Sequence, residues 1–154
     1  MRTFTFDSDV IIHFNVQYPR DVFPSLWENL EELIQRKLIC ICQSVQIELE
    51  RGNDQLIEWV SSLGGFVCHA TGDELILASV ISNLYPGWVR ETTNAADPFI
   101  IAHAELNSHV IVSDERRTNS NVSHQNQKLP NVADARGTES ISLIPFVREM
   151  QWSF

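Results

Sequence analysis

Short apolar runs alternate along this chain with longer segments in which apolar residues recur every three or four positions. The apolar runs occupy residues 2–6, 38–42, 66–70, 109–113 and 141–144. The helical spacing is found at residues 25–36, 44–51, 54–63, 73–85, 97–107 and 145–150. Buried strands that alternate with amphipathic helices predict an α/β fold. We therefore expect three layers, α/β/α, with a mostly parallel central sheet and helices on both faces.

Several helix ends can be predicted from the residues that cap them. Ser25 and Ser44 are expected as N-caps, and Asp97 is expected as an N-cap with Pro98 at the first helical position. The segment 52–54 (GND) should break one helix and cap the next. Residues 115–140 are polar and are expected to form a loop with room for one short helix.

Length and composition indicate one ordinary globular domain. The chain has 154 residues, of which 44% are hydrophobic and 20% charged, so we expect a single domain over residues 1–154. No apolar run approaches the ~20 residues that cross a bilayer. Asp7 and Asp9 interrupt the apolar N-terminal segment, which argues against a signal peptide. A cytoplasmic location without membrane contact is the expectation.

The three cysteines are expected to be reduced core residues. Cys40 and Cys42 lie two positions apart on a predicted strand, so their side chains should point to one face. Cys68 stands alone in a later segment. Without a second closely spaced pair, the pattern favours buried thiols over a zinc site.

The net charge of −9 counts against non-specific binding of nucleic acid, because attraction to phosphate supplies most of that affinity. This repulsion of nucleic acid is partly offset if several of the acids surround a bound metal ion. Arg116, Arg117, Lys128 and Arg136 fall within one C-terminal stretch. These residues are candidates for contacts with RNA phosphates, and a solvated loop is the alternative.

Acidic residues from distant segments stand where predicted strands end or helices begin. They are Asp7, Glu48, Asp97 and the neighbours Asp114 and Glu115. Each has an ordinary alternative role, such as a turn, a helix cap or a solvent-facing side chain. Together, carboxylates gathered at one place repel one another, and a hard cation such as Mg²⁺ neutralises them. Metal ions held by carboxylates are common in enzymes that cleave phosphodiesters, so we expect a metal-dependent nuclease.

The order and spacing of these acids resemble the PIN domain, a metal-dependent nuclease fold. The segments that carry the resemblance are Asp7-Ser8-Asp9-Val10-Ile11, Val45-Gln46-Ile47-Glu48-Leu49, Ala96-Asp97-Pro98-Phe99-Ile100-Ile101-Ala102 and Val112-Ser113-Asp114-Glu115. The resemblance covers residues 3 to about 145. A narrower likeness links residues 18–34, Glu115 and residues 128–132 (KLPNV) with an uncharacterised bacterial PIN-like family that includes toxin candidates. Asp9 and Glu115 depart from the usual pattern, and the doublet leaves the fourth acid ambiguous between Asp114 and Glu115.

The resemblance implies an activity, a site and partners. It implies an endoribonuclease that hydrolyses RNA with Mg²⁺ or Mn²⁺, held by catalytic Asp7, Glu48, Asp97 and Glu115, with Asp114 as a further candidate ligand. Ser8, Arg116, Arg117 and Lys128 become candidates for substrate binding, and Ser8 also for orienting a ligand carboxylate. The family likeness further implies a homodimer and an antitoxin protein as partner, as in a toxin–antitoxin pair.

Two other functions fit part of the sequence. In a phosphatase of the haloacid dehalogenase type, Asp7 would be the nucleophile and Asp9 the acid/base. That mechanism needs a downstream lysine and a later acidic pair, and the only lysines are Lys37 and Lys128. The other alternative is a catalytically inactive PIN fold that binds a protein partner.

Overall fold

The central sheet of the protein is parallel throughout. The computed structural model describes residues 1–52 and 54–154, so Asn53, in the expected break at 52–54, lies outside the described residues. The strands are β1 (Phe4–Phe6), β2 (Ile39–Cys42), β3 (Val67–Cys68), β4 (Val110–Val112) and β5 (Ser140–Ile141). Their order is β3-β2-β1-β4-β5, and every pairing is parallel. The predicted α/β class with a parallel sheet is confirmed.

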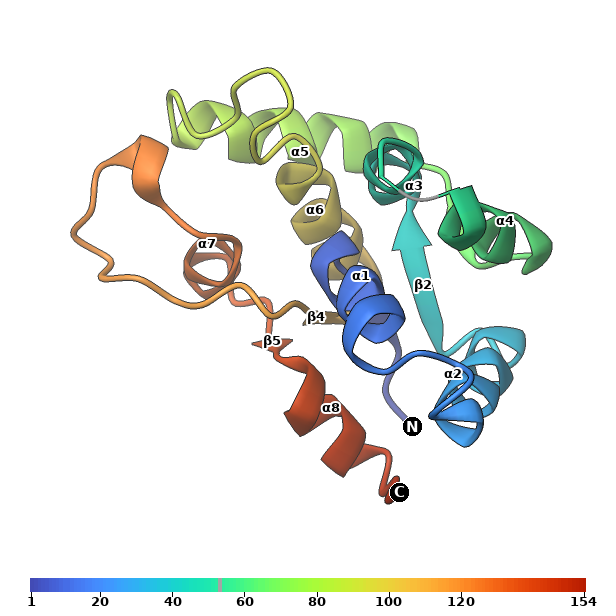
Figure 1. Ribbon diagram of the computed structural model, residues 1–154. Coiled ribbons are helices and arrows are strands. Elements are labelled where there is room, and N and C mark those ends of the chain that lie inside the picture. Colours follow the sequence, from blue (N-terminus) through green and yellow to red (C-terminus); the bar gives the residue numbers. More distant parts are fainter. Residues whose placement is uncertain (53) are drawn as a thin grey trace.

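Helices fill the connections between the strands (Figure 1). They are α1 (Ser8–Gln17), α2 (Pro24–Gln35), α3 (Gln43–Glu50), α4 (Asp54–Ser62), α5 (Gly72–Leu84), α6 (Asp97–Asn107), the 3-10 helix η1 (His124–Asn126), α7 (Leu129–Ala135) and α8 (Leu143–Glu149). The polar stretch 115–140 therefore contains η1 and α7. Within the described part of the chain, no helix is both long and apolar enough to cross a membrane.

Helices cover both faces of the sheet, which makes three layers. On one face, Phe4 and Phe6 of β1 meet the ring of Phe146 in α8, edge to face, with centroids 5.0 Å apart in each pair. Residues of α1, α2 and α8 line one apolar pocket and so belong to this layer. On the opposite face, α6 lies against β1, β2 and β4, and α5 packs on α6. Thr5, between the two phenylalanines, points to this second layer and contacts Cys40.

The strand order places the ends of β1 and β4 at a switch point. The chain winds from β1 through β2 to β3 on one side and then crosses to β4 and β5 on the other. The backbone N–H of Asp7 donates to the carbonyl of Val112 across 2.9 Å, so the two strands end side by side. In parallel α/β sheets, ligands bind outside the carboxyl ends of strands at such a point.

Three of the predicted helix starts are wrong by one or two residues. The N-cap of α2 is Phe23, with Pro24 first in the helix, and the N-cap of α3 is Cys42, directly after its strand. Ala96 is the N-cap of α6, so Asp97 is its first residue. The chain enters these helices earlier than the polar residues suggest, because Pro24 fits a first turn and β2 runs straight into α3. The last strand also ends sooner than predicted, since Leu143 begins α8.

Candidate functional site

Asp7 is fixed at the carboxyl end of β1 by two hydrogen bonds. It is the N-cap of α1, and its Oδ1 accepts from the backbone N–H of Ser8 at 2.7 Å. Its Oδ2 accepts from the hydroxyl of Ser113, the residue after β4, at 2.8 Å. Only 6% of Asp7 is exposed. The ordinary role of a cap is therefore present, but it leaves a buried carboxylate pointing at the end of the neighbouring strand.

Asp97 does not cap its helix. No side-chain hydrogen bond caps α6, and Asp97 is as buried as Asp7, with 6% exposed. Among the described residues, its Oδ2 is a buried oxygen without a hydrogen-bond partner. A buried carboxylate oxygen without a partner carries the full cost of desolvation, which a cation ligated at that oxygen would remove.

Glu115, and not its neighbour Asp114, joins these two acids. One carboxylate oxygen from each of Asp7, Asp97 and Glu115 lies within 4.8 Å of the others. The carboxylate of Asp114 has other partners: Oδ2 contacts His13 Nδ1 at 2.8 Å, and Oδ1 accepts from the backbone N–H of Leu143 at 2.8 Å. Asp114 thus caps the start of α8, and Glu115 is the acid of the doublet that faces the site.

Glu48 approaches the group from α3. The hydroxyl of Ser8 donates to Oε2 of Glu48 at 2.6 Å, and it lies 3.5 Å from Oδ1 of Asp7. Glu48 is half-buried and stands beside the compact group of three. Ser8 therefore positions a carboxylate, which is one of the two roles expected for it.

Burial and mutual repulsion weaken the acidity of the group. Burial, then the charge of Asp9, raises the pKa of Asp7 to about 7. Burial, followed by the charges of Asp7 and Glu115, raises the pKa of Asp97 well above its ordinary value. The pKa of Glu115 is raised by burial and Asp7, against a lowering effect of Lys128. These carboxyl groups are therefore poised to bind a cation or a proton at neutral pH.

The residues present fit a hard divalent cation. Asp7, Asp97 and Glu115 offer oxygen ligands only, which suits Mg²⁺ or Mn²⁺ better than a softer metal. The unpartnered oxygen of Asp97 gives an independent reason for an ion at this place.

The basic residues of the C-terminal stretch are not equivalent. Beside Glu115 lies a cleft of about 620 Å³, lined by Arg116 and Arg117 among others. Arg117 is paired with Asp134 through two hydrogen bonds of 2.7 and 3.0 Å, and Arg136 is paired with Glu105. In the described part of the chain, no hydrogen bond or ion pair engages the guanidinium of Arg116. Arg116 and the exposed Lys128 are thus available to phosphates, whereas Arg117 and Arg136 are engaged by carboxylates of the same chain.

Two residues near the site received no role from the sequence. Ser113 is buried and links Asp7 to the backbone N–H of Glu115, which donates to its Oγ at 3.2 Å. The sequence feature that could have identified Ser113 is its position directly after an apolar strand. His13, one turn into α1, holds Asp114, and nothing in its sequence context indicates that contact.

Comparison with known proteins gives a family and a fold. A family model described as a domain of unknown function (DUF4411) matches residues 4–154. No curated protein matches the chain. Among solved structures, the chain is similar to VapBC2 from Rickettsia felis bound to a DNA fragment from their promoter, with a TM-score of 0.54 and 14% sequence identity. The match covers 92% of this chain and 98% of that one, and at this identity it establishes a shared fold.

Proposed function

This chain belongs to the DUF4411 family, and we propose that it is a metal-dependent endoribonuclease of the PIN type. The observation that carries the proposal is the convergence of Asp7, Asp97 and Glu115, from three distant segments, at the switch point of a parallel sheet. A cluster of several carboxylates at this place is what the motifs predict for a PIN-type nuclease. The fold shared with VapBC2 is compatible with that assignment.

The acids of the chain would hold the ion, and their neighbours would orient the acids. Asp7, Asp97 and Glu115 are the proposed ligands, with Glu48 completing the set from α3. A bound Mg²⁺ or Mn²⁺ would supply charge neutralisation and Lewis-acid polarisation of the phosphate. Ser113 and the backbone N–H of Ser8 each donate to one oxygen of Asp7, which fixes the plane of its carboxylate. Such donors orient a ligand before the ion arrives.

The cleft beside Glu115 is the proposed binding surface for RNA. The net charge of −9 repels a polyanion, so attraction must be local. Arg116 lines the cleft without a competing carboxylate partner, and Lys128 acts electrostatically on Glu115. These two cationic side chains can therefore contact the phosphates of an RNA strand whose backbone reaches the acids.

We also propose that the activity is held in check by an antitoxin protein, as the likeness to PIN-type toxins implies. The fold neighbour, VapBC2 bound to a DNA fragment from their promoter, supports a protein partner for this chain as well. Expression of the wild type alone should slow the growth of a bacterial host, and Asp7→Asn should not. Equal growth of both strains at equal protein levels would contradict the toxin assignment.

Calorimetry and an RNA cleavage assay test the proposed nuclease together. Mn²⁺ is titrated into the wild type and into the Asp7→Asn/Asp97→Asn variant, and each is assayed on single-stranded RNA. A Glu28→Gln/Glu50→Gln variant makes the same charge change at exposed positions and serves as the matched control. We expect metal binding and cleavage in the wild type and the control, and neither in the double aspartate variant.

Other outcomes decide between the alternatives. Metal binding without cleavage would favour the inactive interaction module. Cleavage that survives in the double aspartate variant would identify a contaminating nuclease. No metal binding by the wild type would refute the enzyme assignment.

A further inference from the structure

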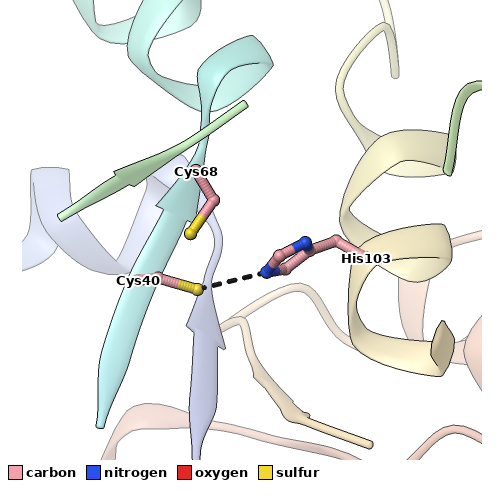
Figure 2. Close-up of side chains that lie close together, drawn as sticks. All are labelled: Cys40, Cys68 and His103. Atoms are coloured by element: carbon pink, nitrogen blue, oxygen red, sulfur yellow. Dashed lines mark hydrogen bonds between the residues drawn. The ribbon is translucent and has the colours of Figure 1, made fainter. Parts of the chain in front are cut away.

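A second group of potential metal ligands lies between the sheet and α6. Cys40 on β2, Cys68 on β3 and His103 on α6 point toward one another (Figure 2). Their Sγ, Sγ and ring nitrogen atoms all lie within 4.8 Å of one another, and Cys40 Sγ is 3.4 Å from His103 Nε2. Their chemistry is soft, unlike that of the oxygen ligands of the acidic group.

The orientation of His103 is fixed from behind by a buried carboxylate. His103 and Glu74 are each 6% exposed, and His103 Nδ1 lies 3.0 Å from Oε1 of Glu74. The carboxylate accepts a hydrogen from Nδ1, so the lone pair of Nε2 can point toward the two sulfur atoms. A histidine that binds a metal usually donates its other ring N–H to a carboxylate in this way.

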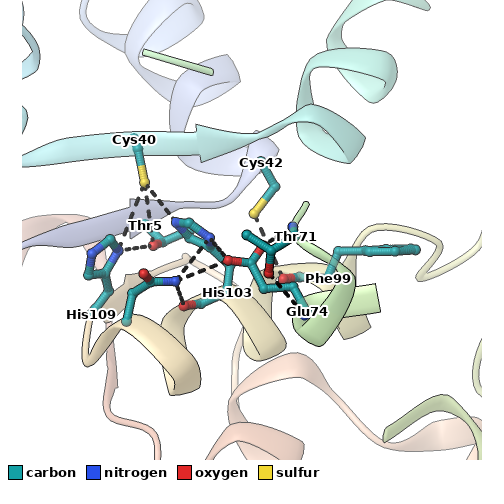
Figure 3. A network of polar contacts seen from close by, with 9 residues as sticks. Thr5, Cys40, Cys42, Thr71, Glu74, Phe99, His103 and His109 are labelled. Atoms are coloured by element: carbon teal, nitrogen blue, oxygen red, sulfur yellow. Dashed lines mark hydrogen bonds and ion pairs between the residues drawn. The ribbon is translucent and has the colours of Figure 1, made fainter. Parts of the chain in front are cut away.

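Glu74 is in turn held by its own neighbours (Figure 3). It belongs to the capping box of α5, in which its backbone N–H donates to the hydroxyl of Thr71 at 3.2 Å and its Oε2 accepts from the backbone N–H of Thr71 at 3.4 Å. The side chain of Asn107 donates to Oε1 at 3.1 Å. A buried chain of polar groups is costly to form in a small core, and this one ends at the two sulfur atoms.

We propose that Cys40, Cys68 and His103 bind one Zn²⁺ in a structural site that joins β2, β3 and α6. Two thiolates and an imidazole neutralise Zn²⁺ and suit its borderline-soft character. The ring of His109 is the candidate for a fourth ligand. Its Nδ1 lies 3.9 Å from Cys40 Sγ and 2.9 Å from the hydroxyl of Thr5.

The spacing of the cysteines along the chain, taken alone, disfavours a zinc site. Closely spaced cysteine pairs mark many zinc sites, and Cys68 has no such neighbour. Here the ligands come from β2, β3 and α6. The parallel pairing of β2 with β3 places Cys68 opposite Cys42, and Cys40 is the neighbour of Cys42 on the same face of β2. Only the fold brings them together.

The proposed zinc site does not depend on the nuclease activity, but it shares a helix with the acidic group. Asp97 is the first residue of α6, and His103 follows six residues later, which is about 9 Å along a helix axis. A zinc ion would thus anchor α6 to the sheet about 1.7 turns from Asp97, the acid that α6 carries to the other site.

Co²⁺ provides a spectroscopic probe of the proposed site. Metal-free protein, kept reduced with a phosphine, is titrated with Co²⁺ and then with Zn²⁺. We expect one equivalent of Co²⁺ to give sulfur-to-cobalt charge-transfer and tetrahedral ligand-field bands, which Zn²⁺ then removes. Cys68→Ser and His103→Gln should weaken Co²⁺ binding at least about tenfold.

Cys42→Ser is the matched control, because Cys42 is also buried on β2 and faces α6, with its Sγ 3.8 Å from the carbonyl of Phe99. The Cys42→Ser variant should keep the charge-transfer bands. The Asp7→Asn/Asp97→Asn variant should keep them too, which would show that the bands do not come from metal bound at the acidic group. Zn²⁺ should raise the thermal midpoint of the wild type and leave that of Cys68→Ser unchanged, and circular dichroism checks that each variant folds. Absent charge-transfer bands in fully reduced wild type, or equal loss in Cys42→Ser and Cys68→Ser, would overturn the proposal.

Discussion

The hydroxyl of Ser8 donates to Oε2 of Glu48 across 2.6 Å and joins the first turn of α1 to the last turn of α3. The two residues are 40 positions apart in the chain, and the contact fixes the direction of a carboxylate that lies in the last turn of a helix rather than at a strand end. The backbone N–H of the same serine donates to Asp7. One residue therefore orients two of the four acids that the motifs single out.

Replacing Ser8 by alanine should weaken metal binding without removing a ligand. The Glu48 side chain would gain rotamer freedom, and we expect a loss of about tenfold in Mn²⁺ affinity, as for other residues that orient metal ligands. Calorimetric titration measures the change. Ser8→Thr keeps the hydroxyl and should bind Mn²⁺ nearly as well as the wild type. Equal affinities of the alanine variant and the wild type would show that the orientation of Glu48 does not matter.

The stability of the metal-free protein should fall as the pH rises. The pKa of Asp7 is raised from 3.8 to about 7 in the folded state, so folding favours its protonated form. This contribution is complete below pH 3.8 and is lost as the pH rises through about 7. We expect the free energy of unfolding in urea to be lower at pH 8 than at pH 5 by at least about 1 kcal/mol.

Two controls assign this pH dependence to the acidic group. Asp7→Asn removes the titrating carboxyl and should flatten the difference between pH 5 and pH 8. Mn²⁺ stabilises the ionised carboxylates and should restore the stability of the wild type at pH 8. A wild type that is equally stable at both values without metal would contradict the proposed burial of these charges.

Glu115 and Asp114 should give opposite results when each is converted to its amide. Glu115→Gln removes a proposed ligand and should lower Mn²⁺ affinity by more than tenfold with little loss of stability. Asp114→Asn should bind Mn²⁺ but unfold more easily by about 1–2 kcal/mol, because Asp114 caps Leu143 and contacts His13. Calorimetry and urea denaturation distinguish the two effects. The reverse pattern would make Asp114 the fourth acid.

Strand positions and the acids at their ends could be predicted, because both depend on local sequence. A short apolar run such as residues 109–113 has few ways to be buried, and the residue after it must lie at the edge of the sheet. Asp7 follows such a run directly, and Glu115 is the second residue after the run at 109–113. Helix α7 is the short helix expected within the polar loop at 115–140, but its position could not be predicted, because its seven residues are too few to show a periodic pattern.

The hydrogen-bond and ion-pair partners of individual side chains could not be predicted. Asp97 looked like a helix cap because Asp before Pro usually is one, and only the fold shows that its side chain turns inward, with Oδ2 buried. Arg117 looked equivalent to Arg116 until the structure placed Asp134 beside it. The group of Cys40, Cys68 and His103 depends on how α6 lies on the sheet, which no spacing encodes.

Arg116 and Arg117 offer a final test, because they are adjacent, exposed and equal in charge. Arg116→Ala should weaken binding of single-stranded RNA and reduce the slope of log affinity against log salt by about 0.7, the value for one lost phosphate contact. Arg117→Ala removes the same charge but chiefly breaks an exposed ion pair with Asp134, which contributes at most about 1 kcal/mol to stability. Fluorescence anisotropy across a salt series, with a catalytically inactive Asp7→Asn background, measures both. Equal slopes in the two variants would mean that the RNA senses only the net charge of this surface and that the cleft beside Glu115 is not its binding site.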